Sequence, residues 1–307
     1  MLQGSQSGIV GCGDIGVRVA RLIQEAGGSV MGLARSPESA ERLSGFGVEP
    51  LFGNLDDPST LNDLPLAGRL VFYLAPPPGG GPFDTRMRNF CASAGSGQPP
   101  RKIVYMSTSG VYGDCGGEWV TEETPVTPQT SRAKRRVDAE QTVTDWGRTQ
   151  GVAVVILRVT GIYGPGRLPL ARLQQGHPLL REDESPPTNR IHADDLATVC
   201  LAAAVKAEDG AIFNVSDGRP GTMTQYFNAL ADLLDLPRSP QVGMEEEKNV
   251  MNLMMLSYLT ETRRMDNRRM SEELGVSLQF PDLETGLKNI LDQLDAPNMG
   301  YLGSVGH

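Results

Sequence analysis

The sequence has few cysteines and no long apolar run. Its four cysteines are scattered, without a CxxC pair or a histidine at metal-ligand spacing, so we expect reduced thiols and no metal site. No stretch approaches the about eighteen apolar residues of a membrane span. The first residues lack the cationic start and apolar core of a signal peptide. We therefore expect a cytoplasmic protein with no membrane partner.

An excess of positive charge is also missing. The 307 residues carry a formal net charge of −9, and the isoelectric point is near 5.0. Affinity for a polyanion needs a broad cationic surface, so nucleic acid is not an expected partner. One short segment runs against this trend: residues 130–141, TSRAKRRVDAEQ, hold Arg132, Lys134, Arg135 and Arg136. This segment is either a solvated helix face or an altered functional pair.

What the chain does have is a regular alternation of strand-like and helix-like segments. The apolar, β-branched segments GIVG, SVMGLA, LVFYLA, KIVYMS and AVVILRV are separated by helical patterns. This order is typical of βαβ units around a buried parallel sheet. We predict an α/β fold, a Rossmann doubly wound parallel sheet with a smaller, mainly helical C-terminal substrate domain.

The composition changes after Gly164, where proline interrupts the chain, and AIFNVSDG later returns to the sheet. We assign residues 1–164 and 189–217 to the dinucleotide-binding Rossmann domain and residues 165–188 and 218–307 to the smaller substrate-binding region. The Met-rich stretch NVMNLMMLSYL is expected to be a packing surface rather than a cofactor pocket. The glycine-rich tail APNMGYLGSVGH is expected to be poorly ordered.

A glycine pattern marks a candidate dinucleotide site. Gly11, Gly13 and Gly16 form GxGxxG directly after a strand and at the start of a helix, which is the context that gives this otherwise weak pattern meaning. Gly11 would allow the tight turn, Gly13 the approach of a pyrophosphate, and Gly16 the packing of helix on strand. The alternative is a tight turn without a ligand. Asp14 and Ile15 complete the loop.

The end of the second strand indicates which dinucleotide binds. An NAD site usually carries an acid there that bonds the ribose 2′-hydroxyl, but this chain has GLARSPES. Arg35 can fork onto a 2′-phosphate and Ser36 can donate to it, so we predict NADP, with NAD as the alternative. The alternative is that Arg35 is exposed to solvent and binds no ligand. The other expected cofactor contacts are Asn54 and Leu55 beside the adenine and Leu74, Ala75 and Pro76 after the fourth strand.

The motifs GCGDIG, FGNLDD, VYMSTSGVYG, VTEETPVTP, LRVTGIYGPGR, NRIHADDLA and IFNVSDG follow one another over nearly the whole chain. In this order the sequence resembles the extended short-chain dehydrogenase/reductase family, in its atypical branch of NAD-dependent epimerases and dehydratases. The resemblance implies a Rossmann fold, a small C-terminal substrate domain and an active site at the carboxyl ends of the strands. It also makes a homodimer through two long helices an expectation.

The same resemblance shows where this chain departs from the family. Typical members carry a Ser or Thr at the end of a strand and YxxxK on the following helix, where positions four apart lie on one face. Thr108 falls at the Ser/Thr position, but Arg132 stands at the tyrosine position and Arg136 at the lysine position. A guanidinium cannot give up a proton near neutral pH, so the classical mechanism with a tyrosine at this helix position is excluded. Arg132 can hold an anion of the substrate, and Arg136 can reach the ribose or a cofactor phosphate. Lys134 and Arg135 are expected to face water.

Other side chains are candidates for the missing proton donor. Tyr112 and Tyr163 lie in loops expected to rim the cleft, although tyrosines there are more often structural. Thr108 is expected to hydrogen-bond the substrate oxygen, because a hydroxyl is a weak acid without a partner. His192 and Asp194 are expected to cap a helix rather than act in catalysis.

Two hypotheses of function remain. The first is an NADP(H)-binding oxidoreductase or epimerase/dehydratase-like enzyme on a small polar or anionic substrate, with Glu122 contacting the substrate or pairing with an arginine of residues 132–136. The second is a catalytically inactive NADP-binding sensor or partner-binding module, favoured by the loss of tyrosine and lysine.

Overall fold

The computed structural model describes residues 3–62, 64–94, 99–244, 246 and 261–295. The Met-rich stretch, residues 249–259, and the tail, residues 296–307, lie outside the described residues, so the expectations for both stay predictions.

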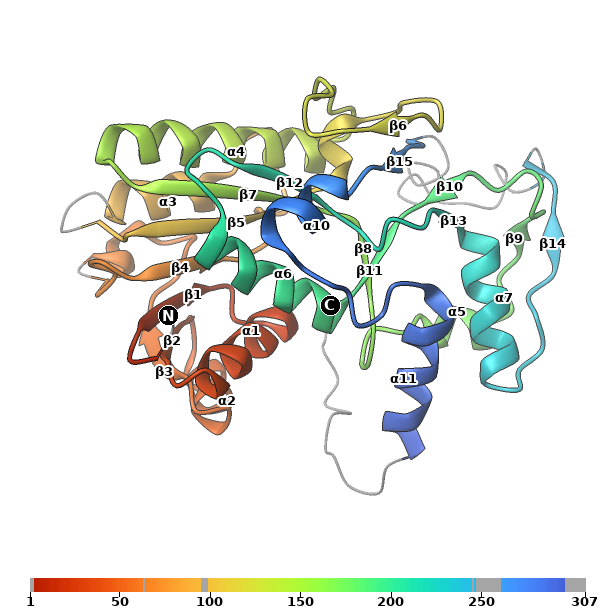
Figure 1. The fold of residues 1–307 in the computed structure, drawn as a ribbon, viewed down its shortest axis with the longest axis horizontal. Coiled ribbons are helices and arrows are strands. Elements are labelled where there is room, and N and C mark those ends of the chain that lie inside the picture. Colours follow the sequence, from red (N-terminus) through yellow and green to blue (C-terminus); the bar gives the residue numbers. More distant parts are fainter. Residues whose placement is uncertain (1–2, 63, 95–98, 245, 247–260, 296–307) are drawn as a thin grey trace.

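A seven-stranded parallel sheet forms the centre of the protein (Figure 1). All the predicted strands are present. β1 and β4 are neighbours, and the strand order runs outward from this pair in opposite directions. In open α/β sheets this switch point opens a crevice at the carboxyl ends of the strands. The predicted Rossmann fold is confirmed. In spatial order the strands are β12 (Ile212–Val215), β7 (Ala153–Val159), β5 (Lys102–Thr108), β4 (Leu70–Tyr73), β1 (Gln6–Val10), β2 (Ser29–Ala34) and β3 (Glu49–Phe52).

Helices cover both faces of the sheet (Figure 1). On one face α1 (Asp14–Glu25), α2 (Pro37–Gly45) and α6 (Ala193–Lys206) pack against side chains such as Phe72. On the other face α3 (Thr85–Ala94) and α4 (Ser131–Gln150) pack against Val71 and Tyr73. Successive side chains of a strand point to opposite faces, so a strand buried on both sides is apolar throughout, as the sequence pattern predicts.

A third apolar cluster lies beside the sheet and forms the smaller region. Tyr163, Tyr226 and Phe227 meet Leu287 and Ile290 there. The elements are α5 (Leu170–Gln174), β9 (Leu179–Leu180), β10 (Pro187–Thr188), β13 (Gly221–Thr222), α7 (Met223–Leu233), β14 (Gln241–Val242) and α11 (Leu283–Asp295).

One helix of the C-terminal part packs on the Rossmann sheet, and the predicted division into domains stays a prediction. α10 (Arg268–Leu274) contacts α6 and β12, and Met270 and Leu274 are fully buried in the core of the Rossmann sheet. Two short parallel pairs tie the neighbouring loops together: β8 (Gly161–Tyr163) with β11 (Arg190–His192), and β6 (Trp119–Val120) with β15 (Arg264–Met265). β15 and α10 therefore pack on the larger domain, whereas α11 belongs to the third cluster.

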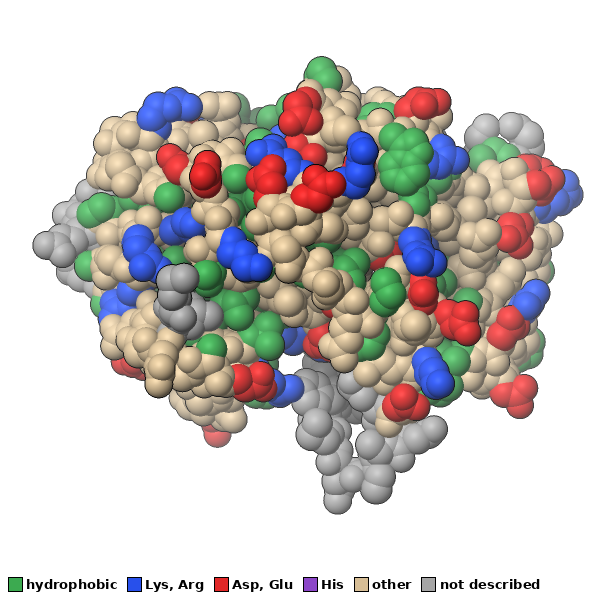
Figure 2. Space-filling model, in the orientation of Figure 1, with side chains coloured by type: hydrophobic (Ala, Val, Ile, Leu, Met, Phe, Trp, Pro, Cys, Tyr) green, Lys and Arg blue, Asp and Glu red, His purple; other side chains and the backbone are tan. Residues whose placement is uncertain are grey.

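Acidic and basic side chains are interspersed over the face shown in Figure 2. Among the described helices, none has both the length and the apolarity needed to cross a bilayer. All four cysteines are unpaired, as predicted.

Candidate functional site

Two of the three glycines in the turn between β1 and α1, Gly11 and Gly16, are closely packed. Gly11 has a φ of +88°, and a Cβ at this position would lie 2.4 Å from the backbone nitrogen of Ala75. Only glycine fits there, because the turn is pressed against the chain that leaves β4. A Cβ on Gly16 would lie 3.2 Å from Ile9 and from the carbonyl oxygen of Gly11, which reflects the close packing of α1 on β1.

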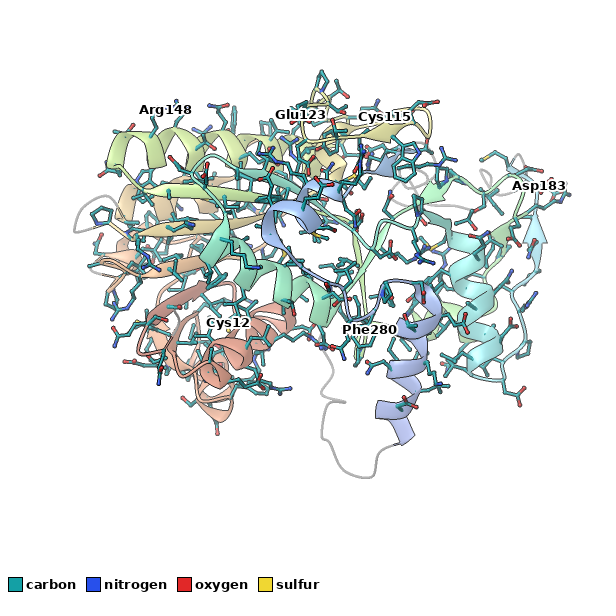
Figure 3. The ribbon with its side chains drawn as sticks, in the orientation of Figure 1. Cys12, Cys115, Glu123, Arg148, Asp183 and Phe280 are labelled. Atoms are coloured by element: carbon teal, nitrogen blue, oxygen red, sulfur yellow. The ribbon has the colours of Figure 1, made fainter. Side chains whose placement is uncertain are left out.

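Gly13 tests whether the turn fits a pyrophosphate. A Cβ there would meet no described atom within 4 Å, so this side of the turn faces open space. Gly13 is also the N-cap of α1, and no side chain caps the helix. The amides of its first turn, at Asp14 and Ile15, therefore face a position where an anion would be stabilised. Cys12, between the two glycines, is buried beside α1 (Figure 3), and burial raises the pKa of its thiol to about 12. The residues present fit the phosphates of a dinucleotide.

The predicted adenosine contacts lie along the same edge of the sheet. Arg35 follows β2 and is exposed, and Ser36 caps α2, where its Oγ accepts a 3.3 Å hydrogen bond from the amide of Ser39. Asn54 follows β3 and accepts from the amide of Asp56, at 3.0 Å, while Leu55 is buried. Leu74, Ala75 and Pro76 follow β4 and complete this edge. All of these residues lie at carboxyl ends of strands, and their contacts with a cofactor stay predictions.

A pocket of about 820 Å³ opens next to this edge, between the sheet and the smaller region. Thr108, the last residue of β5, lines it, and so does Arg132 from the first turn of α4. The structure thus brings together two of the four predicted catalytic residues. The Thr108 Oγ1 accepts a 3.3 Å hydrogen bond from the amide of Gly110, which leaves its proton available to another acceptor.

Guanidinium groups dominate the charge of this pocket. Five arginines line it, whereas Glu261 is the one carboxylate among the described lining residues. The arginines are Arg132, Arg167, Arg172, Arg190 and Arg263.

Arg190 is a buried guanidinium in this pocket. It is 8% exposed, its Nη2 donates to the carbonyl of Thr222 at 2.8 Å, and its guanidinium lies 4.7 Å from the ring centre of Tyr226. No described carboxylate lies within 4 Å of it. Burial lowers the pKa of Arg190, because a desolvated charge is unfavourable, and the nearby Tyr226 and Asp217 oppose this shift only in part. An anion in the pocket would add to the counter-charge.

Arg132 occupies an unusual position for a cation. It lies in the first turn of α4, which contains no acidic residue and whose amides carry partial positive charge. Its side chain is exposed to the pocket, and no described carboxylate lies within 4 Å. The helix terminus and the guanidinium together favour an anion at this point.

The other arginines of this segment are inside the protein. Arg136 is 7% exposed, and its Nη1 donates to the Tyr105 hydroxyl at 3.1 Å and to the Met106 carbonyl at 2.9 Å. It therefore joins α4 to the end of β5. The prediction that Arg135 faces water is wrong: the side chain is 7% exposed, and its Nη1 donates to the carbonyl of Gly81 at 2.7 Å. The loop after β4, which folds over α4, covers it. Lys134 is exposed, as predicted.

The two tyrosines predicted as alternative proton donors are poorly placed for this role. Tyr112 is fully buried; its hydroxyl donates to Asn214 Oδ1 at 2.7 Å and accepts from Arg158 at 3.0 Å. Tyr163 lines the pocket, but its hydroxyl donates to the carbonyl of Asp282 at 3.2 Å. Burial raises the pKa of both phenols. These positions argue against either phenol as an acid.

The remaining candidates have structural contacts. His192 caps α6, since its Nδ1 accepts from the amide of Asp194 at 3.3 Å, and this confirms the predicted cap. Glu122 accepts a 2.7 Å hydrogen bond from the amide of Asn214 rather than pairing with residues 132–136. No group of three potential metal ligands comes together in the described part of the chain.

Sequence reasoning missed Arg190, Arg263 and Glu261, which enter the pocket from segments distant in the sequence. Arg190, inside NRIHADDLA, was an available signal, because an arginine beside a buried strand is rarely buried without a partner.

Comparisons with known proteins agree with this arrangement. Residues 9–216 match the NAD dependent epimerase/dehydratase family. The chain is 28% identical over 288 residues to Protein YeeZ of Escherichia coli (strain K12), which covers 89% of this chain and 96% of that protein. A functionally unknown conserved protein from Silicibacter pomeroyi DSS is 31% identical, with a TM-score of 0.79 over 94% of this chain and 99% of its own. UDP-glucuronic acid 4-epimerase from Bacillus cereus, solved in complex with NAD, is 17% identical, with a TM-score of 0.73 over 96% of this chain and 99% of its own, which shows a shared fold.

Proposed function

Because this chain belongs to the NAD dependent epimerase/dehydratase family, we propose that it is an NADP(H)-binding oxidoreductase or epimerase/dehydratase-like enzyme that acts on a small anionic substrate without the usual tyrosine and lysine. One observation carries the proposal: Thr108 and Arg132 line the same pocket as four further arginines, with Glu261 as the one carboxylate among the lining residues that the structure describes. An anionic substrate would add counter-charge to the buried guanidinium of Arg190, which a neutral substrate would not.

The cofactor part of the proposal rests on the glycine turn. The amides at the start of α1 would hold the pyrophosphate, while Arg35 and Ser36 would bind the 2′-phosphate. A nicotinamide dinucleotide supplies or accepts a hydride at the substrate carbon. The NAD in the Bacillus cereus epimerase supports a nicotinamide dinucleotide in general, whereas the preference for NADP rests on Arg35 and Ser36, so NAD is the alternative.

The chain's own residues would bind and orient the substrate. Thr108 would donate a hydrogen bond from its hydroxyl to the reacting oxygen, and Arg132 would hold an anionic group beside it. Arg136 acts through the ends of β4 and β5, which it joins to α4 by its bonds to Ala75 and Met106, at 3.4 and 2.9 Å. Arg136 is therefore a positioning residue, in place of the predicted contact with the ribose.

Glu261 is a further candidate to contact the substrate. Its Oε1 is buried without a hydrogen-bond partner among the described residues, and its Oε2 lies 3.7 Å from Arg263. Burial raises the pKa of Glu261, so this carboxyl takes up a proton more readily than an exposed one. A substrate hydroxyl would complete its hydrogen bonding.

Two measurements test the proposal. The first is a fluorescence titration with NADPH and NADH, in which we expect tighter binding of NADPH. The second is a turnover screen of phosphorylated and carboxylated carbonyl compounds with wild type, Thr108→Val and Arg132→Ala. We expect about 10²-fold or greater loss of kcat/KM in Thr108→Val and a rise mainly in KM in Arg132→Ala. Arg148→Ala, at the far end of α4 (Figure 3), is the control and should match wild type. Turnover that neither change affects would remove both residues from the mechanism.

The second candidate is a catalytically inactive NADP-binding sensor or partner-binding module, favoured by Arg132 and Arg136 at the tyrosine and lysine positions. NADPH binding with no turnover of any anionic carbonyl compound would support it. The homodimer expected from the family resemblance stays a prediction.

A further inference from the structure

The arginine-lined pocket holds few groups that can exchange a proton near neutral pH. Its guanidinium groups stay protonated there. The other ionisable groups of the described lining residues are the phenols of Tyr163 and Tyr226 and the carboxyl of Glu261. Burial raises the pKa of both phenols, for Tyr226 to about 12. Among the lining residues that the structure describes, Glu261 is therefore the group best suited to transfer a proton near neutral pH.

Glu261 belongs to a segment that is bound to the loop after β5. The amide and the hydroxyl of Thr262 both donate to Asp114 Oδ1, at 2.9 and 3.1 Å. Asp114 lies two residues after the single-turn helix η2 (Ser109–Tyr112), whose N-cap is Thr108. On its other side the segment leads into β15, which pairs with β6 (Figure 1). The backbone that carries Glu261 is therefore fixed to the chain that leaves Thr108.

The carboxyl group of Glu261 is enclosed but incompletely hydrogen-bonded. The side chain is 10% exposed, and its Oε2 lies 3.7 Å from Nη2 of Arg263. Arg263 also donates through Nη1 to the carbonyl of Gly113, so its guanidinium is held on the same loop. Oε1 of Glu261 is buried and has no hydrogen-bond partner among the described residues. A buried carboxyl oxygen without a partner is unfavourable, so Oε1 favours either a proton or a donor on a ligand.

Three influences set the proton affinity of this carboxyl. Burial is the largest and raises the pKa of Glu261. Asp114, in the loop after η2, acts in the same direction, while Arg263 lowers the pKa. A raised pKa makes a carboxyl a better acid catalyst near neutral pH. Arg263 in turn stabilises the carboxylate that remains after the proton has left.

We propose that Glu261 is the catalytic acid and base of the pocket, in place of the tyrosine that typical family members carry at the position of Arg132. This inference rests on the proposed function. When a carbonyl compound is reduced, its carbon gains a hydride from the reduced nicotinamide, and the O–H bond of the Glu261 carboxyl breaks as the proton passes to the carbonyl oxygen. The products are the alcohol, the oxidised dinucleotide and the Glu261 carboxylate, which regains a proton from water. Oxidation of the alcohol reverses both transfers. Thr108 hydrogen-bonds the same oxygen.

The experiment follows the oxidation of NADPH, or of NADH if it binds more tightly, with the most active compound of the turnover screen. Dihydroxyacetone phosphate and oxaloacetate represent the phosphorylated and carboxylated carbonyl compounds in that screen. The proteins are wild type, Glu261→Gln, Glu261→Asp and the control Glu123→Gln, whose carboxylate is 75% exposed outside the pocket. We expect Glu261→Gln to lower kcat by about 10²-fold or more and to leave KM within about fivefold, because the amide keeps the shape of the carboxyl but cannot transfer a proton. Glu261→Asp should recover part of kcat, and Glu123→Gln should match wild type.

The pH profile of kcat distinguishes proton transfer from a structural role. Only the protonated carboxyl donates, so kcat for reduction by wild type should fall by about tenfold per pH unit above the pKa of Glu261. Glu261→Gln should lack this fall. A profile that Glu261→Gln retains, or a loss of turnover that comes from a higher KM alone, would overturn the inference while the proposed function stands.

Two further outcomes complete the test. Melting temperatures check that each variant is folded, and if Glu261→Gln is not, Glu261→Asp decides: a wild-type kcat and pH profile in that variant would overturn the inference. If wild type oxidises neither dinucleotide with any compound of the screen, the enzymatic part of the proposed function fails, and the role of Glu261 fails with it.

Discussion

Arg167 and Asp14 form an ion pair, 2.9 Å between Nη1 and Oδ2, that joins a loop of the arginine-lined pocket to the first turn of α1, the helix after the glycine turn. Arg18 extends this contact, because it binds Asp14 at 2.9 Å and also pairs with Asp194 at the start of α6. A network of ion pairs therefore connects the arginine-lined pocket with the helix that follows the glycine turn.

The strength of this ion pair can be measured by a double-mutant cycle. Arg167 is 34% and Asp14 25% exposed, so solvent screens the interaction. We expect Arg167→Ala and Asp14→Asn to be coupled by about 0.5–1 kcal/mol in urea unfolding. Exactly additive effects would mean that the pair adds nothing to stability.

Two glycines of the same turn should respond differently to alanine. Gly13→Ala should keep the stability of wild type, since a Cβ there meets open space, yet it should weaken NADPH binding by about tenfold or more because the methyl group occupies the pyrophosphate position. Gly11→Ala should lower the free energy of unfolding by roughly 2–5 kcal/mol because of its positive φ and its contact with Ala75. Thermal melts and NADPH titrations check both. A Gly13→Ala protein that binds NADPH like wild type would place the phosphates elsewhere.

The buried ion pair between Arg158 and Glu140 should be essential for folding. The two groups lie 2.9 Å apart and their side chains are 6% and 8% exposed. Glu140→Ala leaves Arg158 charged and buried, so we expect a loss of about 3–5 kcal/mol in urea unfolding. The control is Asp145→Ala, which removes the exposed partner of Arg148 and should change stability by less than about 0.5 kcal/mol. Equal stability of the two variants would contradict the prediction.

Stability should fall in mild acid because of His192. Burial lowers the pKa of this fully buried imidazole to about 4; Arg18 acts in the same direction, while Asp194 and Asp14 oppose it. The unfolded chain takes up the proton near pH 6.5 and the folded protein only near pH 4. The contribution of His192 is therefore fully present above about pH 6.5 and is lost as the pH falls towards about 4, which amounts to about 3 kcal/mol.

The comparison of wild type with His192→Gln in urea unfolding isolates this effect. Burial raises the pKa of Asp217 to about 6, which gives a slope of opposite sign, but that slope is common to both proteins. Parallel pH profiles from neutral pH down to about pH 4.5 would show that His192 does not carry the acid sensitivity.

Neutralising the pocket carboxylate should favour simple anions. Glu261→Gln removes the one described carboxylate that lines the pocket beside five guanidinium groups. We expect inorganic diphosphate to bind a fewfold more tightly to this variant at neutral pH, as measured by calorimetry. Glu123→Gln, outside the pocket (Figure 3), should leave the affinity unchanged. A weaker diphosphate affinity in Glu261→Gln would show that the carboxylate mainly orients Arg263.

Local sequence alone determined the strands and the glycine turn. A strand buried on both faces needs a continuous apolar run, and a turn at positive φ against a neighbouring strand needs Gly11, so both leave a signature within a few residues. The place of Thr108 at the end of β5 and of Arg132 at the start of α4 followed from motifs in the same way.

Only the tertiary structure decided which charged side chains meet. Arg135 and Tyr112 are buried because loops and strands distant in the sequence cover them, at Gly81 and Asn214. Arg190 and Arg263 reach the pocket from segments that β11 and β15 bring beside the sheet. The spacing of apolar residues predicts which face of a helix or strand is buried. Packing between distant segments sets the solvation and the partners of a charged group, and these determine its chemistry.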